Sequence, residues 1–297
     1  MGRTHVSRPR RLINKLIVQV QNEWLRRERV FGHPFQLTLE SGNVCNLGCP
    51  LCPTPVREKR LPSGMLKVDD ARRIIDRFPY LTLIVLSNWG EPFLNKRLPE
   101  IIRYARSKHI RVHLESNLTL LTNDQAEAVV ASGLDTLMVA LDGATQASYA
   151  AYRVGGVQED VLENVRRIRR VQERTGDRRT ELVWKFVENR HNEHELETAR
   201  AMALELGMRF ERVTIWSPPG QEDEWRPRSA EGAGRRTTTG SPKRCHNLWQ
   251  VVTVNFNGDL HTCCSEFAPS DRIGNVLEEE FAPLWNGPEY RRRRREN

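Results

Sequence analysis

The sequence has 297 residues, of which 38% are hydrophobic and 28% charged, so it is long enough for one large globular domain, or one large and one small. Lys and Arg total 46 against 38 for Asp and Glu, which gives a formal net charge of +8. No apolar run approaches the roughly 20 residues of a membrane-spanning helix, and the first residues lack the order of a secretory signal. We therefore expect a cytoplasmic protein without a membrane span.

The positive charge is concentrated at the two ends of the chain. Five consecutive arginines occupy residues 291–295, and Arg3, Arg8, Arg10 and Arg11 lie near the start. We expect both groups to be solvated basic tails. The alternative is an RNA-binding or RNA-modifying protein whose arginines contact phosphates. A nucleic-acid partner is disfavoured because no basic surface with interleaved aromatic residues accompanies the arginines.

Residues 1–35 are predicted to be a basic, amphipathic helical segment. The helical stripe consists of Leu12, Leu16, Val20 and Trp24, spaced four apart, with Ile13 and Ile17 beside them. We expect this stripe to pack against the body of the protein, and the alternative is contact with a membrane surface.

Residues 36–216 alternate strand and helix signals, so we predict one domain here. The predicted strands are 36–40, 81–87, 110–116, 135–142, 181–188 and 209–216, and the predicted helices between them are 68–78, 97–108, 122–133, 157–175 and 193–206. Such alternation predicts a parallel sheet with right-handed crossover helices, closed or partly closed into a barrel. Chemistry in these folds collects at the carboxyl ends of the strands.

Residues 217–244 are rich in Pro, Gly, Ser and Thr and are predicted to be a flexible linker. A compact piece follows at 245–297. It contains a predicted strand at 248–256, a turn at Asn257-Gly258 and a returning strand at 259–263, which together form a hairpin.

The first group of cysteines carries the clearest chemical signal. Cys45, Cys49 and Cys52 have the spacing C-x3-C-x2-C in a chain without a secretion signal, which disfavours disulfides and favours a metal. Three thiolates on one loop can each bind a different iron of a [4Fe–4S] cluster and leave the fourth iron open. The alternative is zinc, which wants a fourth ligand such as His33, His246 or a distal cysteine.

This cysteine loop resembles the signature of radical S-adenosylmethionine (SAM) enzymes, which fold as a partial (β/α)6 barrel. Residues 88–92 are similar to the family's Gly-Gly-Glu-Pro stretch after strand two, with Trp89 in place of the first Gly. The resemblance implies that backbone groups of this stretch and Glu91 hold the methionyl amino group of SAM.

Other segments extend the resemblance. Ser116-Asn117-Leu118 stands where many members have Thr-Asn-Gly, Asp142-Gly143 resembles the Asp-Gly after strand four, and Arg153 matches an Arg that can approach the SAM carboxylate. The implied SAM site comprises Trp89, Gly90, Glu91, Pro92, Ser116, Asn117, Asp142 and Arg153. The structural alternative is a set of ordinary turns and an exposed arginine.

The resemblance also implies the chemistry. A reduced [4Fe–4S] cluster binds SAM at its open iron and cleaves it to a 5′-deoxyadenosyl radical, which abstracts a hydrogen atom from the substrate. The electron would come from a donor such as flavodoxin or ferredoxin.

The C-terminal piece resembles the SPASM or shorter twitch extension, in which cysteines bind an auxiliary iron–sulfur cluster. Here Cys245, Cys263 and Cys264 match, but the further Cys-x2-Cys of relatives is missing. The fourth position would be open to substrate or filled by Glu266, His246 or Asp271. The alternative is a hairpin lid without a cluster, because adjacent cysteines in a strand point to opposite faces.

The resemblance and the residues together predict a radical SAM oxidoreductase or lyase-type enzyme. Lys185 and Trp184 on the fifth strand and Trp216 after the sixth are candidates to line the substrate cavity, and the alternative for both tryptophans is packing between barrel and helices. We favour a sugar- or nucleoside-type natural-product intermediate that undergoes dehydrogenation, epimerisation or decarboxylation. The alternative substrate is a ribosomal peptide or protein, which would make the enzyme a maturase.

Overall fold

One nine-stranded sheet organises the chain, and the computed structural model describes residues 6–25, 27–54, 63–215, 222–228, 245–266 and 269–297. The strands are β1 (Gln36–Leu39), β2 (Leu83–Val85), β3 (Arg111–Ser116), β4 (Thr136–Ala140), β5 (Glu181–Glu188), β6 (Arg209–Thr214), β7 (Val251–Val254), β8 (Asp259–His261) and β9 (Gly274–Asn275). Their order is β6-β5-β4-β3-β2-β1-β7-β8-β9. The first seven strands pair in parallel, and β8 and β9 are antiparallel.

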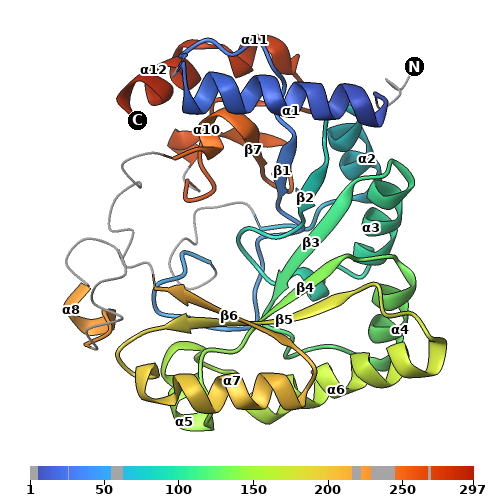
Figure 1. The fold of residues 1–297 in the computed structure, drawn as a ribbon, viewed down its shortest axis with the longest axis vertical. Helices are drawn as coiled ribbons and strands as arrows, with labels where there is room; N and C mark the ends of the chain where they lie inside the picture. The colour runs from blue at the N-terminus through green and yellow to red at the C-terminus, as the bar shows by residue number, and fades with distance from the viewer. Residues whose placement is uncertain (1–5, 26, 55–62, 216–221, 229–244, 267–268) are drawn as a thin grey trace.

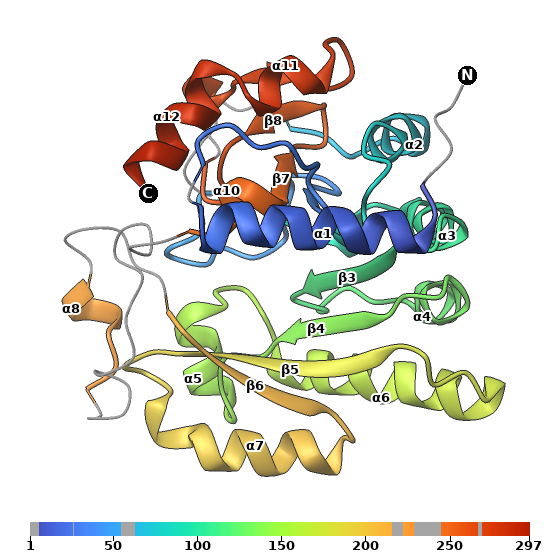
Figure 2. The same cartoon turned by 45° about the horizontal axis from the view of Figure 1, so that its top comes forward.

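Helices connect successive strands and cover the outer face of the sheet (Figures 1 and 2). The α-helices are α1 (Arg8–Glu23), α2 (Val68–Asp76), α3 (Leu98–Ser107), α4 (Asn123–Ala131), α5 (Gln146–Tyr152), α6 (Gln158–Thr175), α7 (Leu196–Glu205), α8 (Glu222–Trp225), α10 (Asn247–Gln250), α11 (Phe281–Trp285) and α12 (Pro288–Glu296). Short 3-10 turns are η1 (Pro92–Leu94), η2 (Glu193–Glu195) and η3 (Pro269–Asp271). None of the helices in the described ranges is long and apolar enough to cross a membrane.

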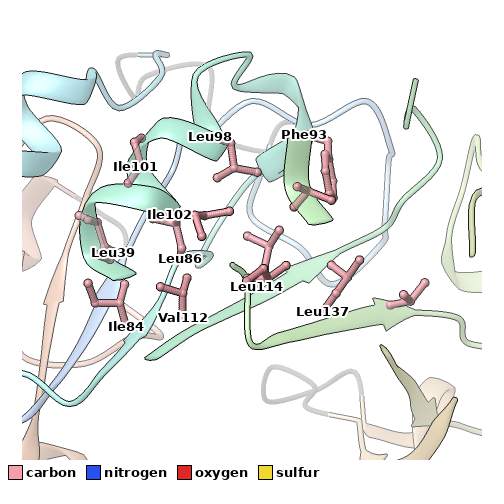
Figure 3. Close-up of a cluster of buried hydrophobic side chains, with 14 of the residues drawn as sticks. Leu39, Ile84, Leu86, Phe93, Leu98, Ile101, Ile102, Val112, Leu114 and Leu137 are labelled. Atoms are coloured by element: carbon pink, nitrogen blue, oxygen red, sulfur yellow. The ribbon is translucent and has the colours of Figure 1, made fainter. Parts of the chain in front are cut away.

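The main core lies between the sheet and the outer helices. In β3, Val112 and Leu114 are buried against the helices, whereas His113 and Glu115 alternate to the inner face. Figure 3 shows the strand side chains meeting α3 through Leu98, Ile101 and Ile102. The sheet is open at both edges, which confirms the predicted partial-barrel α/β class.

The C-terminal segment joins the barrel through its backbone. β7 pairs in parallel with β1, with Thr38 opposite Thr253, so the predicted hairpin extends the main sheet. The expected strand at 248–256 is shorter, because residues 247–250 form the helix α10.

Helix α1 faces the opposite way from our expectation. The predicted packing of the apolar stripe is wrong, because Leu12, Leu16, Val20 and Trp24 are all exposed. The buried side of α1 carries Val18 among polar residues instead.

The interpretation of both chain ends as solvated basic tails also fails in part. Residues 291–295 lie in α12, where Arg294 is buried and stacks on Trp285 with its Cζ 4.4 Å from the ring centroid. Arg11 is buried at the other end and donates hydrogen bonds to the carbonyls of Leu81 and Lys108, each over 3.0 Å. The other four arginines of the C-terminal run form ion pairs with Glu28, Glu266, Glu289 or Glu296.

Most of the predicted linker, 217–244, lies outside the described residues. Residues 222–228 are described, and they include α8, whose Trp225 is buried against Leu51 and Ile215. This piece of the expected linker is therefore packed against the barrel.

Candidate active site

A cavity of about 670 Å³ opens at the carboxyl ends of the parallel strands. Its lining includes Cys45, Cys49 and Cys52 after β1 and residues 87–91 after β2. The ends of β3 to β6 complete it with Glu115, Ser116, Asn117, Ala140, Lys185, Val187, Val213 and Thr214. Parallel strands bring their carboxyl ends to one edge, so segments far apart in sequence meet here.

The three cysteines share this cavity, and two of them have side-chain N–H donors nearby. Asn117 Nδ2 lies 3.6 Å from Cys45 Sγ, and Arg153 Nη1 lies 3.7 Å from Cys49 Sγ. Burial raises the pKa of the Cys45 thiol to about 11. Donors aimed at sulfur fit thiolates that carry iron, because such bonds offset the negative charge of a buried cluster.

The arrangement of the thiols also bears on the zinc alternative. Within the described ranges, no three Cys, His, Asp or Glu side chains converge closely enough to hold a single metal ion. A zinc site needs such convergence, whereas an iron–sulfur cube takes each thiolate on a separate corner. The loop therefore fits a cluster better than a single ion.

Gly90 shows why the stretch after β2 needs glycine. Its φ is +93°, and a Cβ there would lie 2.3 Å from the carbonyl oxygen of Gly42. Trp89 is not among the described residues with positive φ, so its backbone does not require glycine. Its side chain lines the cavity. The departure from Gly-Gly-Glu-Pro at position 89 is thus accommodated.

Glu91 ties the ends of β2 and β3 together. Its buried carboxylate accepts hydrogen bonds from Ser116 Oγ at 2.6 Å, Phe93 N at 3.0 Å and Asn117 N at 2.8 Å. Burial raises the pKa of Glu91, while these hydrogen bonds oppose that rise. The predicted residues Glu91, Ser116 and Asn117 thus form one cluster in which the carboxylate mainly supports the backbone.

Asn117 connects that cluster to the cysteine loop. Its Nδ2 donates to Asn46 Oδ1 over 3.1 Å, and its Oδ1 accepts from Thr119 N over 3.0 Å. The next residue, Leu118, has a φ of 55°, in the left-handed region where glycine is favoured. Ser116 Oγ accepts from Leu118 N at 2.8 Å and stabilises this turn.

Arg153 and Asp142 lie side by side although 11 residues separate them in sequence. Arg153 Nε donates to Asp142 Oδ2 over 2.6 Å, and Asp142 Oδ1 accepts from Val187 N over 2.8 Å. Asp142 is fully buried. Despite the cost of burial, the nearby carboxylate raises the pKa of Arg153, so the guanidinium keeps its charge. Arg153 is therefore a fixed cation at the cavity wall, not the exposed arginine of the structural alternative.

The inner face of the sheet adds an ion pair. Lys185 Nζ lies 2.7 Å from Glu115 Oε1, and both residues line the cavity. Lys185 therefore lies where the sequence predicted. Trp184 instead packs in the main core and donates to the Leu141 carbonyl over 2.7 Å, and Trp216 lies outside the described residues.

The second cysteine group reaches the rim of the same cavity. β8 ends at His261, so Cys263 and Cys264 follow in a turn and the opposite-face constraint does not apply. The hydrogen bond with Cys263, burial and nearby Cys245 all raise the pKa of Cys264. Ser265 lines the cavity. The three thiols influence one another electrostatically, and Ser265 and Asn88 connect Cys264 to the cavity wall.

Asn88 and Glu266 hold the second cysteine group in place. With its amide oriented to suit both neighbours, Asn88 donates to the Cys264 carbonyl over 3.0 Å. Glu266 Oε2 accepts from Cys263 N over 3.2 Å, and its Oε1 pairs with Arg293 at 2.5 Å. His246 Nδ1 hydrogen-bonds Asn22 at 2.8 Å. Of the predicted fourth ligands, Glu266 and His246 therefore already have protein partners.

Two features of the site were missed by the sequence analysis. Glu115 could have been found from the alternation of β3, because it shares a face with His113 and not with the buried Leu114. Trp225 carried no signal, because it stands alone in a polar segment. It contacts Tyr152 edge to face at 5.3 Å between ring centroids and packs against Leu51 of the cysteine loop.

Comparisons with known proteins agree with this geometry. The Radical SAM superfamily profile matches residues 39–182, and the profile of the SPASM iron-sulfur cluster-binding domain matches residues 245–297. An AdoMet-dependent heme synthase from Nitratidesulfovibrio vulgaris is 32% identical over 123 residues, 41% of this chain and 33% of that protein. A PqqA peptide cyclase from Gluconobacter oxydans is 24% identical over 281 residues, 85% of this chain and 76% of that protein.

A solved structure shares the fold. Streptococcus suis SuiB, determined bound to S-adenosylmethionine, aligns with a TM-score of 0.66 and 13% identity over 88% of this chain and 68% of that chain. The chain spans about a third of the heme synthase, so that enzyme's activity does not transfer with the match.

Each of the two profile matches covers one of the two cysteine groups. They imply a [4Fe–4S] cluster and SAM as cofactors, with an auxiliary iron–sulfur cluster in the C-terminal domain. The chain is thus a member of the radical SAM superfamily with a SPASM domain.

Proposed function

We propose that the chain is a radical SAM maturase that oxidises a residue of a ribosomally made peptide or protein. One observation carries the proposal: the first cysteine group lines the cavity, and the second group adjoins its wall. Ser265, next to Cys264, lines it together with Cys45, Cys49 and Cys52. A substrate there would have an electron acceptor beside the same cavity if the second group holds its cluster, and this favours net oxidation over a redox-neutral reaction.

The residues have separable roles in this proposal. Cys45, Cys49 and Cys52 would hold the [4Fe–4S] cluster, and Cys245, Cys263 and Cys264 an auxiliary one. When bound and reduced, the first cluster with SAM supplies the radical that removes a hydrogen atom from the substrate. The electron for that reduction would come from a flavodoxin or ferredoxin.

The walls of the cavity bind and orient SAM. The fixed guanidinium of Arg153 suits the SAM carboxylate, because Asp142 holds it at the wall beside Cys49. The close approach of Gly90 to Gly42 leaves backbone groups of the β2 turn for the methionyl amino group. Glu91 acts as a positioning residue, since its oxygens already accept from Ser116, Phe93 and Asn117.

A peptide substrate is better supported than the sugar or nucleoside that the sequence analysis favoured. A relative that aligns with 85% of the chain is a peptide cyclase. The cavity also offers both signs of charge in Lys185 and Glu115, which suits the donors and acceptors of a peptide.

Anaerobic turnover tests the proposal. The reduced, iron-loaded protein is incubated with SAM and either a mixture of ribosomal precursor peptides or a mixture of sugars and nucleosides. We expect only the peptides to stimulate 5′-deoxyadenosine formation and a modified peptide to lose two hydrogen atoms by mass. Stimulation by the small molecules alone would replace the peptide proposal, and a mass-neutral product would contradict oxidation.

The two cysteine groups need separate tests. Iron and sulfide are quantified anaerobically in the wild type, in Cys45→Ala/Cys49→Ala/Cys52→Ala and in Cys263→Ala/Cys264→Ala. We expect about eight irons in the wild type and about four in each variant. About four irons in the wild type, lost only in the first variant, would show that the C-terminal cysteines hold no cluster.

A further inference from the structure

Helix α1 presents a continuous apolar face to solvent. The exposed fractions run from 42% for Ile17 to 80% for Trp24. The face is made of Leu12, Ile13, Leu16, Ile17, Val20 and Trp24. Helical spacing puts these six residues on one side, and we call them the α1 stripe. Figures 1 and 2 show α1 lying across the molecular surface beside α10.

The opposite side of α1 is polar, yet it is the side that packs. Arg11 donates to the carbonyls of Leu81 and Lys108, and Asn14 exchanges hydrogen bonds with the backbone of His33 at 2.8 and 2.9 Å. Gln21 Oε1 accepts from Phe31 N at 2.9 Å. Rotating the helix to bury the stripe would leave these groups without their partners, so the orientation is fixed by the fold.

Close packing reinforces that orientation. Val18 is fully buried at the centre of the packed side, and a Cβ on Gly32 would lie 2.5 Å from its Cγ2. The segment after the helix thus runs directly against α1. The apolar stripe faces outward because the opposite side of α1 is already packed against the protein and hydrogen-bonded to it.

Basic side chains border the α1 stripe. By helical position Arg8 and Lys15 lie along one border and Arg10 along the other, and Arg27 follows the helix. No carboxylate in the described part of the chain forms an ion pair with these four residues. Lys15 and Arg27 instead lie over the rings of Phe35 and Phe31, at 5.7 and 5.8 Å.

We propose that α1 docks in the plane of an anionic lipid surface, with the stripe among the acyl chains and the basic borders at the headgroups. A helix with one broad apolar face and cationic flanks has the pattern of interfacial helices. Anionic headgroups supply the negative charge that the borders lack. The proposal is independent of the enzyme's substrate.

Charge argues against a second copy of this chain as the occupant. A two-fold pairing of the stripe with itself would bring the basic borders of both copies together. Arg8, Arg10 and Lys15 would then face like charges. A lipid surface offers acyl chains to the α1 stripe and anionic headgroups to its basic borders.

Vesicle flotation of the full chain tests this. We compare vesicles of phosphatidylcholine alone with vesicles that also contain phosphatidylglycerol, at low and high salt. We expect flotation with the anionic vesicles, weakened by salt. In Leu12→Ser/Leu16→Ser/Val20→Ser the partition coefficient should fall by at least about tenfold, because three apolar anchors are lost.

Matched variants separate the stripe from general surface effects. Leu120→Ser/Val157→Ser/Leu204→Ser removes three exposed apolar side chains outside α1 and should float like the wild type. Arg8→Gln/Arg10→Gln/Lys15→Gln should lose the preference for anionic vesicles, whereas Arg72→Gln/Arg166→Gln/Arg200→Gln should keep it. Each variant is first checked for an unchanged unfolding midpoint.

Three outcomes would overturn the proposal. The first is no flotation of the wild type, and the second is equal flotation of the stripe variant and its control. The third is a wild-type dimer in solution that the stripe substitutions convert to a monomer without any vesicle binding, which would assign the stripe to a second copy.

Discussion

Arg153 donates its Nε–H to the buried carboxylate of Asp142 over 2.6 Å while its Nη1 lies 3.7 Å from the sulfur of Cys49. This one side chain thereby connects the end of β4 to the cysteine loop after β1. Asp142, which follows β4, also accepts a hydrogen bond from Val187 N of β5. The carboxylate that holds the guanidinium is therefore itself anchored by two strands. Its position is set before any ligand binds.

Replacing Arg153 by Met should weaken both SAM binding and the fold. Asp142 would be left as a buried carboxylate with only a backbone donor, which costs about 3–5 kcal/mol of unfolding free energy. We expect at least about a tenfold rise in the SAM dissociation constant, measured by equilibrium binding. The double variant Arg153→Met/Asp142→Asn should recover stability but not affinity. Recovery of both would show that the arginine does not contact SAM.

Glu91→Gln should destabilise the junction of β2 and β3. Glu91 accepts from three donors, and a glutamine must turn its amide N–H2 toward at least one of them. We expect a loss of about 1–3 kcal/mol in chemical denaturation. The exposed Glu127→Gln serves as the control. Equal stability of both variants would show that the Glu91 carboxylate is not committed to the three donors.

Glu40 should make stability depend on pH. Burial raises the pKa of this carboxyl from its ordinary 4.5 to about 7, although Phe256 N donates to it over 3.2 Å. Between these values the folded chain keeps the proton and the unfolded chain has released it, so stability falls as pH rises. Relative to the wild type, Glu40→Gln should gain stability from about pH 4.5 upward, by up to about 3 kcal/mol at pH 8. Unfolding free energies of the two proteins that run parallel between pH 4.5 and 7 would contradict this.

Lys185→Met should separate substrate binding from SAM binding. Lys185 pairs with Glu115 at 2.7 Å on the cavity wall. We expect substrate-stimulated 5′-deoxyadenosine formation to fall by about tenfold or more, because Glu115 is left unpaired in the cavity. The SAM dissociation constant should stay unchanged, and the exposed Lys96→Met should behave as the wild type. Loss of SAM affinity in Lys185→Met would place the pair in the cofactor site.

Arg294→Ala should be far more damaging than Arg292→Ala. Arg294 is buried, donates to the carbonyls of Leu248 and Glu28 over 2.9 Å each, and stacks on Trp285. Its removal leaves two carbonyls without a donor and the Trp285 ring without its stacked guanidinium. We therefore expect the free energy of unfolding to fall by about 2–4 kcal/mol in thermal or chemical unfolding. Arg292 is exposed and pairs only with carboxylates of its own helix, so its removal should leave the midpoint unchanged. Equal effects would show that the run acts as one charged surface.

The strand and helix order of the barrel was predictable because its signals are local. Each strand carries a short apolar run, and helix starts and ends have chemical markers. One marker is Thr122, whose side chain caps α4 in a capping box with Gln125, and another is Gly176, with a φ of 69° after α6. The cysteine spacing and the residues after β2 to β4 were predictable for the same reason.

The remaining features depend on tertiary contacts. Periodicity showed that α1 has an apolar stripe but could not show which way the stripe faces, because the buried polar side chains find partners far away in sequence. Residues 291–295 are all arginine, so the sequence could not show which of them is buried. The position of α12 buries Arg294. The segment 248–250 (Leu-Trp-Gln) could be read as strand or helix, and three residues are too few for periodicity to decide.

The parallel pairing of β1 with β7 joins residues more than two hundred positions apart in the chain. During synthesis β1 therefore has β2 on one side and an open edge on the other until residue 254 has left the ribosome. Open edges recruit other chains, and pairings between distant segments form slowly. The first cysteine loop follows directly from β1, so the strand that precedes it gains its second neighbour only after residue 254 has been synthesised. Conditions that shorten the time between translation and iron delivery should therefore raise the soluble yield of this protein.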